Sequence, residues 1–210
     1  MPRCMILPAY ILGDIKKMLA EERYDYLICA DGGYRHAETA GLTPDLIIGD
    51  FDSAEFPIGK EKIVISVPVE KDDTDTMLCV KKALELGYKD LVILGGIGGR
   101  LDHTFANIQT LAYAAGRGAR ACLRDAYNEV HLLLPGSYIL PKYDGKLSLF
   151  AYSEEVLGLS IHGVHYPLEN ASIDQFFPIV TSNEIIEDLA EVSFTDGILL
   201  MILSKENENE

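Results

Sequence analysis

Residues 90–102 read DLVILGGIGGRLD, an apolar run joined to the start of a helical pattern by a loop with four glycines. Leu, Ile and Val make up the run, as expected of a strand that is covered on both faces. The next segment, 102–115, has apolar side chains at helical spacing, at Phe105, Ile108, Ala112 and Ala115. This stretch therefore predicts a strand, a glycine loop and a helix that covers the sheet with that apolar face.

The same alternation extends over the first 125 or so residues. Apolar runs, each predicted to be a strand, occur at 4–12, 26–30, 45–49, 63–69, 90–95 and 119–124. Helical patterns lie between them, near 14–23, 34–40, 74–86 and 102–115. Repeated strand–helix–strand units predict an α/β fold with a mostly parallel sheet and flanking helices, a Rossmann-like arrangement.

The hydrophobic period changes from about residue 128. Apolar and polar side chains alternate over 147–151 and over 157–161, as in strands with one buried face. Asp196-Gly197, between two further apolar runs, predicts a tight hairpin. We therefore expect an α/β domain over 1–127, followed by a small antiparallel β-sandwich domain over 128–210.

Composition limits the classes of partner. The 210 residues include 33 Asp and Glu against 18 Lys and Arg, a formal net charge of −15. Such a chain repels nucleic acid and anionic membrane surfaces, so neither is expected as a partner. Four cysteines far apart in apolar stretches predict buried thiols, and no apolar run approaches the roughly 20 residues that span a bilayer. These features predict a cytoplasmic protein.

Acidic residues follow four of the predicted strands. Asp31 follows 26–30, Asp50 and Asp52 follow 45–49, Asp72, Asp73 and Asp75 follow 63–69, and Asp102 follows the glycine loop after 90–95. The carboxyl ends of parallel strands meet at one edge of a sheet, where open α/β folds bind ligands. The sequence therefore predicts a cluster of carboxylates at that edge, although Asp72 or Asp73 is also explained as a helix cap.

The chemistry of this cluster favours a hard cation and a phosphate. Oxygen ligands without neighbouring His or Cys suit Mg²⁺, which binds one or two carboxylates together with substrate phosphates. The glycines of residues 95–99 let the backbone approach a phosphate closely at the start of a helix, and Arg100 can pair with it in a bidentate manner. These residues predict metal-assisted chemistry on a polyphosphate.

Several segments, in this order along the chain, resemble the thiamine pyrophosphokinase family. They are Ala30-Asp31-Gly32-Gly33, Pro44 to Ser53, Lys71 to Thr76, Gly98-Gly99-Arg100-Leu101-Asp102-His103, Gly163 to Leu168 and Thr181-Ser182-Asn183-Glu184. The resemblance implies that ATP and thiamine give thiamine diphosphate and AMP with Mg²⁺, the thiamine hydroxyl attacking the β-phosphorus. It also implies a homodimer with active sites between subunits, whose β-sandwich domain binds thiamine and forms the dimer.

The resemblance further assigns site residues. Metal and catalytic roles fall to Asp50, Asp52 and Asp75, with Asp102 as a further catalytic residue, and either Asp75 or Asp102 could be the general base. The implied nucleotide site comprises Asp31, Gly32, Gly33, Gly98, Gly99, Arg100 and His103. The implied thiamine site comprises Tyr166, Ser182 and Asn183, with Tyr166 stacking on the ligand.

One departure and two alternatives accompany this assignment. The family usually has a small, glycine-containing turn after the first strand, whereas this chain has Pro8-Ala9-Tyr10. The same residues would also serve diphosphoryl transfer to another primary alcohol, or a nucleotide or thiamine sensor without catalysis.

Overall fold

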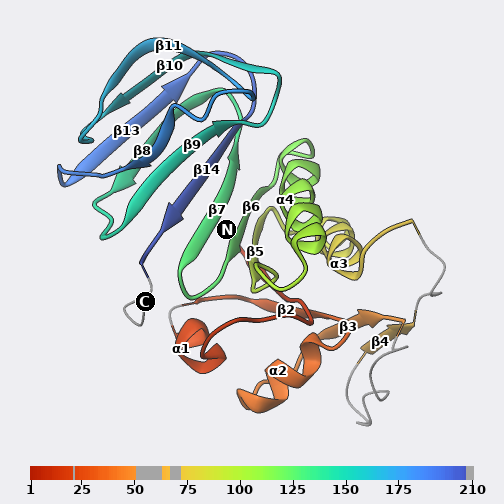
Figure 1. Cartoon of the computed structure of the whole chain (residues 1–210). Coiled ribbons are helices and arrows are strands. Elements are labelled where there is room, and N and C mark those ends of the chain that lie inside the picture. Colours follow the sequence, from red (N-terminus) through yellow and green to blue (C-terminus); the bar gives the residue numbers. More distant parts are fainter. Residues whose placement is uncertain (21, 51–62, 67–71, 207–210) are drawn as a thin grey trace. The chain divides into compact units, whose positions relative to one another are not determined.

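The computed structural model describes residues 1–20, 22–50, 63–66 and 72–206. The chain divides into two compact units, Met1–Ala126 and Tyr127–Glu210, which we call the first and the second unit (Figure 1). Each is described by itself.

The first unit contains a parallel sheet. Its strands are β1 (Arg3–Leu7), β2 (Tyr26–Ala30), β3 (Leu46–Gly49), β4 (Ile63–Ser66), β5 (Asp90–Leu94) and β6 (Arg120–Arg124). They lie in the order β4-β3-β2-β1-β5-β6, and every neighbouring pair is parallel. Met5 of β1 is thereby in register with Leu27 on one side and Val92 on the other. The α/β class predicted from the sequence is confirmed.

Four helices flank this sheet. They are α1 (Ile15–Ala20), α2 (Gly33–Thr39), α3 (Asp75–Glu85) and α4 (Leu101–Ala115). Figure 1 shows α1 and α2 on one face and α3 and α4 on the other. Both faces are therefore covered, which is why the strands read as uninterrupted apolar runs. β1 ends at Leu7, earlier than the predicted 4–12, because Pro8 offers no N–H to a sheet.

The predicted inward face of α4 is right at Ala115 and wrong at Phe105. Its buried residues are Asn107, Thr110, Leu111, Ala114 and Ala115, whereas Phe105 is 59% exposed. The prediction used only the spacing of apolar side chains, and this spacing placed Phe105 on the inward face. In the structure Asn107 turns inward because its amide donates a hydrogen bond of 2.9 Å to the Gly96 carbonyl.

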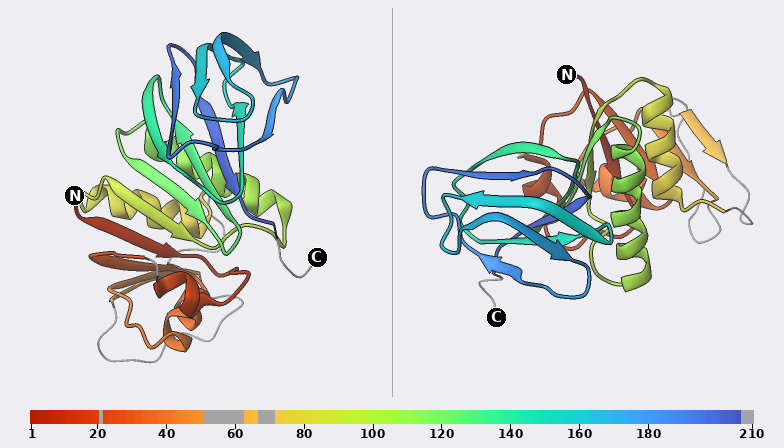
Figure 2. Two further views of the ribbon diagram at one scale, coloured as in Figure 1. Left: turned by 90° about the vertical axis from the view of Figure 1, so that its left-hand side faces the viewer. Right: turned by 90° about the horizontal axis from the view of Figure 1, so that it is seen from above.

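The second unit is antiparallel. Its strands are β7 (Asn128–Leu133), β8 (Gly136–Pro141), β9 (Lys146–Ala151), β10 (Glu155–His162), β11 (Leu168–Asp174), β12 (Val180–Asn183), β13 (Leu189–Phe194) and β14 (Leu199–Ser204). These strands form two sets of hydrogen-bonded neighbours, in the orders β12-β9-β14-β7 and β11-β10-β13-β8. Buried side chains from both form one apolar cluster, which includes Leu149, Val156 and Val192, and Figure 2 shows the strands in further views.

The predicted hairpin at Asp196-Gly197 is also wrong. β13 pairs with β10 and β8, whereas β14 pairs with β7 and β9, so the turn carries the chain from one set of strands to the other. The turn itself is real, because the Asp196 carboxylate accepts the Gly197 N–H at 2.8 Å. Turn chemistry specifies a reversal of the chain, but not which strands then pair.

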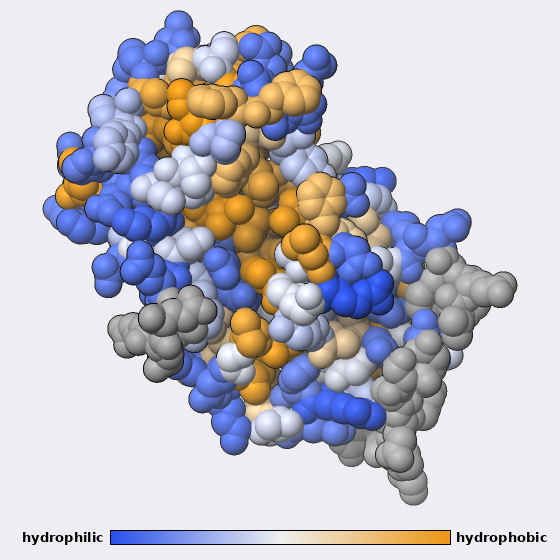
Figure 3. Space-filling model, viewed as in Figure 1, coloured by the Kyte–Doolittle hydropathy of each residue, from blue (hydrophilic) through white to orange (hydrophobic). Residues whose placement is uncertain are grey.

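Some apolar side chains of the second unit remain exposed. Figure 3 shows apolar residues gathered over this unit on the face that it draws. Phe176 is 81% exposed, and Phe177, Ile179 and Leu189 are more than half exposed. Within the described part of the chain, no helix has the length and apolar character needed to cross a membrane.

Candidate active site

A cavity of about 350 Å³ opens at the carboxyl edge of the parallel sheet. Its walls come from the segments after β1, β2 and β5 and from the first turns of α3 and α4. They comprise Pro8, Ala9, Tyr10, Ala30, Asp31, Thr74, Asp75, Thr76, Gly96, Gly98, Arg100, His103 and Asn107. The predicted edge is therefore where the cavity lies, and it holds five of the predicted site residues: Asp31, Asp75, Gly98, Arg100 and His103.

Asp31 is held in an unusual conformation at this edge. Its φ is +45°, and its N–H donates to the Ile48 carbonyl at 2.7 Å. Gly49 allows this close approach, since a Cβ at that position would lie 2.7 Å from the Asp31 Cα. Carboxylate oxygen Oδ1 of Asp31 is buried, and no donor among the described residues reaches it. A buried oxygen without a partner costs about 1–3 kcal/mol, so this position is suited to a cation or a donor from a ligand.

The glycine loop is shaped by contacts with α4 and with the chain after β1. Gly95, Gly96, Gly98 and Gly99 all have positive φ, from +64° to +111°. At Gly99 a Cβ would lie 2.9 Å from the Tyr10 ring. The Gly98 N–H donates to Thr104 Oγ1 at 3.0 Å, which ties the loop to the first turn of α4.

The segment Pro8-Ala9-Tyr10 was a departure from the family pattern, and the structure makes it a wall of the cavity. The Tyr10 carbonyl accepts the Gly96 N–H at 2.7 Å, and the Ala9 carbonyl bonds to His36 Nε2 at 2.9 Å. Sequence reasoning missed Tyr10 and also Asn107. The available signals were the strand break at Pro8 and a polar residue on an otherwise apolar helix.

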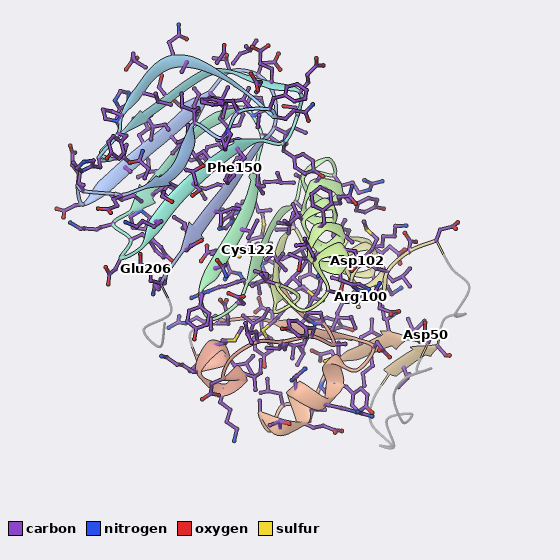
Figure 4. All side chains as sticks on the ribbon, viewed as in Figure 1. Asp50, Arg100, Asp102, Cys122, Phe150 and Glu206 are labelled. Atoms are coloured by element: carbon purple, nitrogen blue, oxygen red, sulfur yellow. The ribbon has the colours of Figure 1, made fainter. Side chains whose placement is uncertain are left out.

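Arg100 and Asp102 pair with one another at the start of α4 (Figure 4). Arg100 Nη2 lies 2.5 Å from Asp102 Oδ2, and Nε lies 3.2 Å from Oδ1. The hydrogen bond from Arg100 lowers the pKa of the Asp102 carboxyl below its usual value, and the pKa of Arg100 is raised. Both side chains are mostly exposed, and among the described residues Asp102 is outside the cavity wall. A phosphate would therefore compete with Asp102 for the guanidinium group.

The remaining predicted carboxylates lie as follows. Asp75 is the first residue of α3, whose N-cap is Thr74, since Thr74 Oγ1 accepts the Met77 N–H at 3.2 Å. Asp50 directly follows β3 and is half-buried (Figure 4). Asp52 lies outside the described residues.

Three predicted nucleotide-site glycines, Gly32, Gly33 and Gly99, adjoin residues of the cavity wall without being part of it. Gly32 is the N-cap of α2, and Gly33 is the buried first residue of that helix. Gly99 packs against the ring of Tyr10, as described above.

The predicted thiamine-site residues gather in the second unit. Tyr166 is 67% exposed, and its ring makes a T-shaped contact with the ring of His165, with 4.5 Å between centroids and 73° between the ring planes. The backbone N–H and C=O of Tyr166 are both hydrogen-bonded to the side chain of Asn183, which is 2% exposed. Ser182 is exposed and has φ +60°. The structure thus brings these three residues together, while their contact with thiamine stays a prediction.

A glycine- and carboxylate-lined cavity at the carboxyl edge of a parallel sheet is typical of enzymes that act on phosphorylated ligands. Two family models match the chain. The model described as "Thiamin pyrophosphokinase, catalytic domain" covers residues 18–123, and "Thiamin pyrophosphokinase, vitamin B1 binding domain" covers 137–199.

Relatives agree with these matches. A thiamine pyrophosphokinase from Bacillus subtilis is 36% identical over 172 residues, which are 79% of this chain and 80% of the relative. Thiamin pyrophosphokinase 1 of Caenorhabditis elegans is 30% identical over 173 residues, 76% of this chain and 70% of the relative.

Solved structures show the same similarity. The crystal structure of the B. subtilis enzyme has a TM-score of 0.85 at 28% identity and covers 98% of this chain and 100% of that one. A Geobacillus thermodenitrificans thiamin pyrophosphokinase has a TM-score of 0.84 at 28% identity and covers 98% and 99%. The chain belongs to the thiamine pyrophosphokinase family. The predicted enzyme class, an ATP:thiamine diphosphotransferase, is thereby confirmed.

Proposed function

We propose that this protein transfers the diphosphoryl group of ATP to the hydroxyl of thiamine, in the cavity at the carboxyl edge of the parallel sheet. The products are thiamine diphosphate and AMP. The observation that supports this site is the convergence of Asp31, Asp75, Arg100 and the glycine loop on one cavity in a member of this family. A diphosphoryl transfer needs mainly alignment and charge neutralisation, which such a cavity can supply.

The donors at this edge fit Mg²⁺. Asp31 offers a buried oxygen without a partner among the described residues, Asp75 lines the same cavity, and Asp50 follows the neighbouring strand. All are hard oxygen ligands. We therefore assign metal binding to Asp50 and Asp75 as predicted, with Asp52 from the sequence alone, and add Asp31. When bound, Mg²⁺ would neutralise charge on the phosphate oxygens.

The chain's own groups bind the nucleotide and handle the proton. The backbone of the glycine loop, with Arg100 and His103, faces the phosphates. Of the two carboxylates considered as general base, Asp75 lines the cavity, whereas Asp102 is paired with Arg100. We therefore assign the base to Asp75.

The second unit supplies the thiamine-binding residues in this proposal. Tyr166 offers an exposed ring for the aminopyrimidine or the cationic thiazolium, and Ser182 offers a hydroxyl. We further propose that the two sets of antiparallel strands in the second unit pack as a β-sandwich, that the first unit is Rossmann-like, and that the enzyme is a homodimer with active sites between subunits. The exposed apolar side chains of the second unit support a dimer.

A cytoplasmic location is part of the same proposal. All four cysteines lie in the described part of the chain and none of them forms a disulfide. Burial raises the pKa of the Cys4 thiol to about 12, so this thiol is unreactive at neutral pH. Cys4, Cys29 and Cys79 are buried as predicted, whereas Cys122 is half-buried. Reduced cysteines of this kind are usual in a reducing compartment.

A product assay tests the proposed reaction. Purified protein with Mg²⁺, ATP and thiamine should form thiamine diphosphate and AMP in equal amounts. ADP as the nucleotide product would contradict diphosphoryl transfer. Faster reaction with another primary alcohol would show that this alcohol, rather than thiamine, is the acceptor. Tight thiamine binding without any product would indicate a sensor.

A further inference from the structure

The segment that carries Tyr166 runs antiparallel to the end of β12 and the chain after it. Val164 and Ile185 form an antiparallel bridge, and the His165 N–H donates to the Glu184 carbonyl at 2.9 Å. If this short ladder continued by one pair, the N–H and C=O of Tyr166 would bond to a peptide group of the opposite segment.

The side chain of Asn183 takes the place of that peptide group. Its Oδ1 accepts the Tyr166 N–H at 3.0 Å, and its Nδ2 donates to the Tyr166 carbonyl at 2.8 Å. Oδ1 also accepts the Glu184 N–H at 2.9 Å. A carboxamide has the same donor and acceptor as a peptide unit, so it can extend a ladder by one pair. Both main-chain groups of Tyr166 are thereby fixed.

Burial separates the roles of the two neighbours, Ser182 and Asn183. Asn183 is 2% exposed, and its oxygen already holds two N–H groups, so it presents little to a ligand that arrives from solvent. Ser182 is exposed, in a left-handed conformation, with its N–H donated to Ser148 Oγ at 3.0 Å. Backbone strain of this kind persists where the surrounding structure holds it, often at ligand sites.

We infer that Asn183 is a positioning residue, which acts on thiamine through Tyr166, and that Ser182 is the member of the pair that contacts the ligand. This inference rests on the proposed function and replaces the direct contact with thiamine that the resemblance implies for Asn183. Fixing the backbone of one residue has a cost in conformational entropy. The Asn183 carboxamide fixes the Tyr166 backbone when the protein folds. The cost therefore does not arise again when thiamine binds to the ring.

A double-mutant cycle separates positioning from direct contact. The four proteins are wild type, Asn183→Ala, Tyr166→Ala and the double variant, and the readout is kcat/KM for thiamine with KM for ATP measured in parallel. Asn183→Ala should lower kcat/KM for thiamine about tenfold and leave KM for ATP unchanged. In the Tyr166→Ala background the same change should have less than a twofold effect, because the ring that it positions is gone.

A binding measurement gives a second readout that needs no turnover. The chain contains no Trp, so Tyr166→Trp makes a single-tryptophan reporter for thiamine. Asn183→Ala in this protein should raise the mobility of the indole, seen as lower fluorescence anisotropy, and weaken thiamine binding. Asn183→Asp, which keeps the acceptor for the Tyr166 N–H, should restore part of the affinity.

Val192→Ala is the matched control for loss of stability. Val192 is fully buried in β13 and takes no part in the Tyr166 hydrogen bonds, so its truncation should lower Tm without changing thiamine affinity. Additive losses in the cycle, or an Asn183→Ala protein that behaves like Val192→Ala, would overturn the inference. Absence of thiamine diphosphate from the wild-type reaction would instead overturn the proposed function and, with it, this role.

Discussion

The cavity of the first unit and the Tyr166 region of the second are built in different ways. At the cavity, side chains from four separate segments converge because parallel strands end at one edge, and a buried carboxylate oxygen of Asp31 lacks a partner among the described residues. At Tyr166 the ring is exposed, and the backbone that carries it is hydrogen-bonded to the buried side-chain amide of Asn183. The comparison indicates that the first region is suited to binding charged groups, whereas the second is suited to recognising the shape of a ligand through the Tyr166 ring.

The comparison predicts the largest loss for a carboxylate of the cavity. Asp75→Asn removes the assigned base and a metal ligand with little change of volume, so kcat should fall about 10²–10⁴-fold. Steady-state kinetics check the rate, and circular dichroism checks the fold.

Asp73→Asn is the control for this change, two residues earlier. Asp73 pairs with Lys81 at 2.6 Å, both side chains being about one-third exposed, and ion pairs that water reaches contribute little. Its kcat should stay within about twofold of wild type. Equal losses in both variants would show that charge in this segment matters, rather than the position of Asp75 in the cavity.

A smaller loss is expected from the glycine loop, and it should concern ATP alone. Gly99→Ala places a methyl group 2.9 Å from the Tyr10 ring and should raise KM for ATP about 10–100-fold by displacing the loop. Gly118→Ala has a matching φ, +68° against +64°, with nothing within 4 Å of the added carbon. The control therefore carries the same backbone strain, about 1–2 kcal/mol, and should leave KM for ATP unchanged.

The second region should respond in thiamine affinity only. Tyr166→Ala should raise KM for thiamine about tenfold, as expected for the loss of one aromatic contact, with kcat nearly unchanged. Tyr166→Phe keeps the ring and should behave like wild type. A large fall in kcat for Tyr166→Ala would place the ring at the reacting groups and erase the distinction between the two regions.

The smallest expected effects concern two exposed ion pairs, one in each region. Arg100 lowers the pKa of Asp102, and Lys146 lowers the pKa of Glu184, from ordinary values of 3.8 and 4.5. A depressed folded-state pKa adds stability that is present above the ordinary value and is lost as pH falls through the folded value. Both pairs should therefore stay formed through neutral pH. Carboxyl ¹³C NMR titration checks this, and Arg100→Gln or Lys146→Gln should return each midpoint toward its ordinary value.

The sequence predicted the elements of the first unit well because their signals are local. The apolar runs at 26–30 and 45–49 correspond to β2 and β3 within one residue, and the helices lie close to their predicted ranges. The sequence also placed Asp31 and Asp75 at the correct edge, since each follows a strand. It did not predict that Asn107 lies on the inward face of α4, because this position depends on the hydrogen bond between Asn107 and Gly96.

Pairing over longer distances was beyond the reach of local patterns. Asp196-Gly197 marks a turn in any context, but strands β13 and β14 find different partners because each apolar face packs into the shared core. Tyr10 looked like an interruption, and only its packing against Gly99 shows that it shapes the glycine loop.

The amino-acid sequence by itself determined the alternation of strands and helices, the change of period near residue 128, and the acidic residues that follow the strands. Burial periodicity is local, and parallel strands bring their carboxyl ends to one edge, so these features can be deduced from order along the chain. Only the tertiary structure decided which groups satisfy one another. Asp31 lies against Gly49, the Gly96 N–H donates to the Tyr10 carbonyl, and Asn183 bonds to Tyr166. Hydrogen bonds need contact within about 3 Å, and close packing of distant segments, which periodicity does not encode, sets that contact.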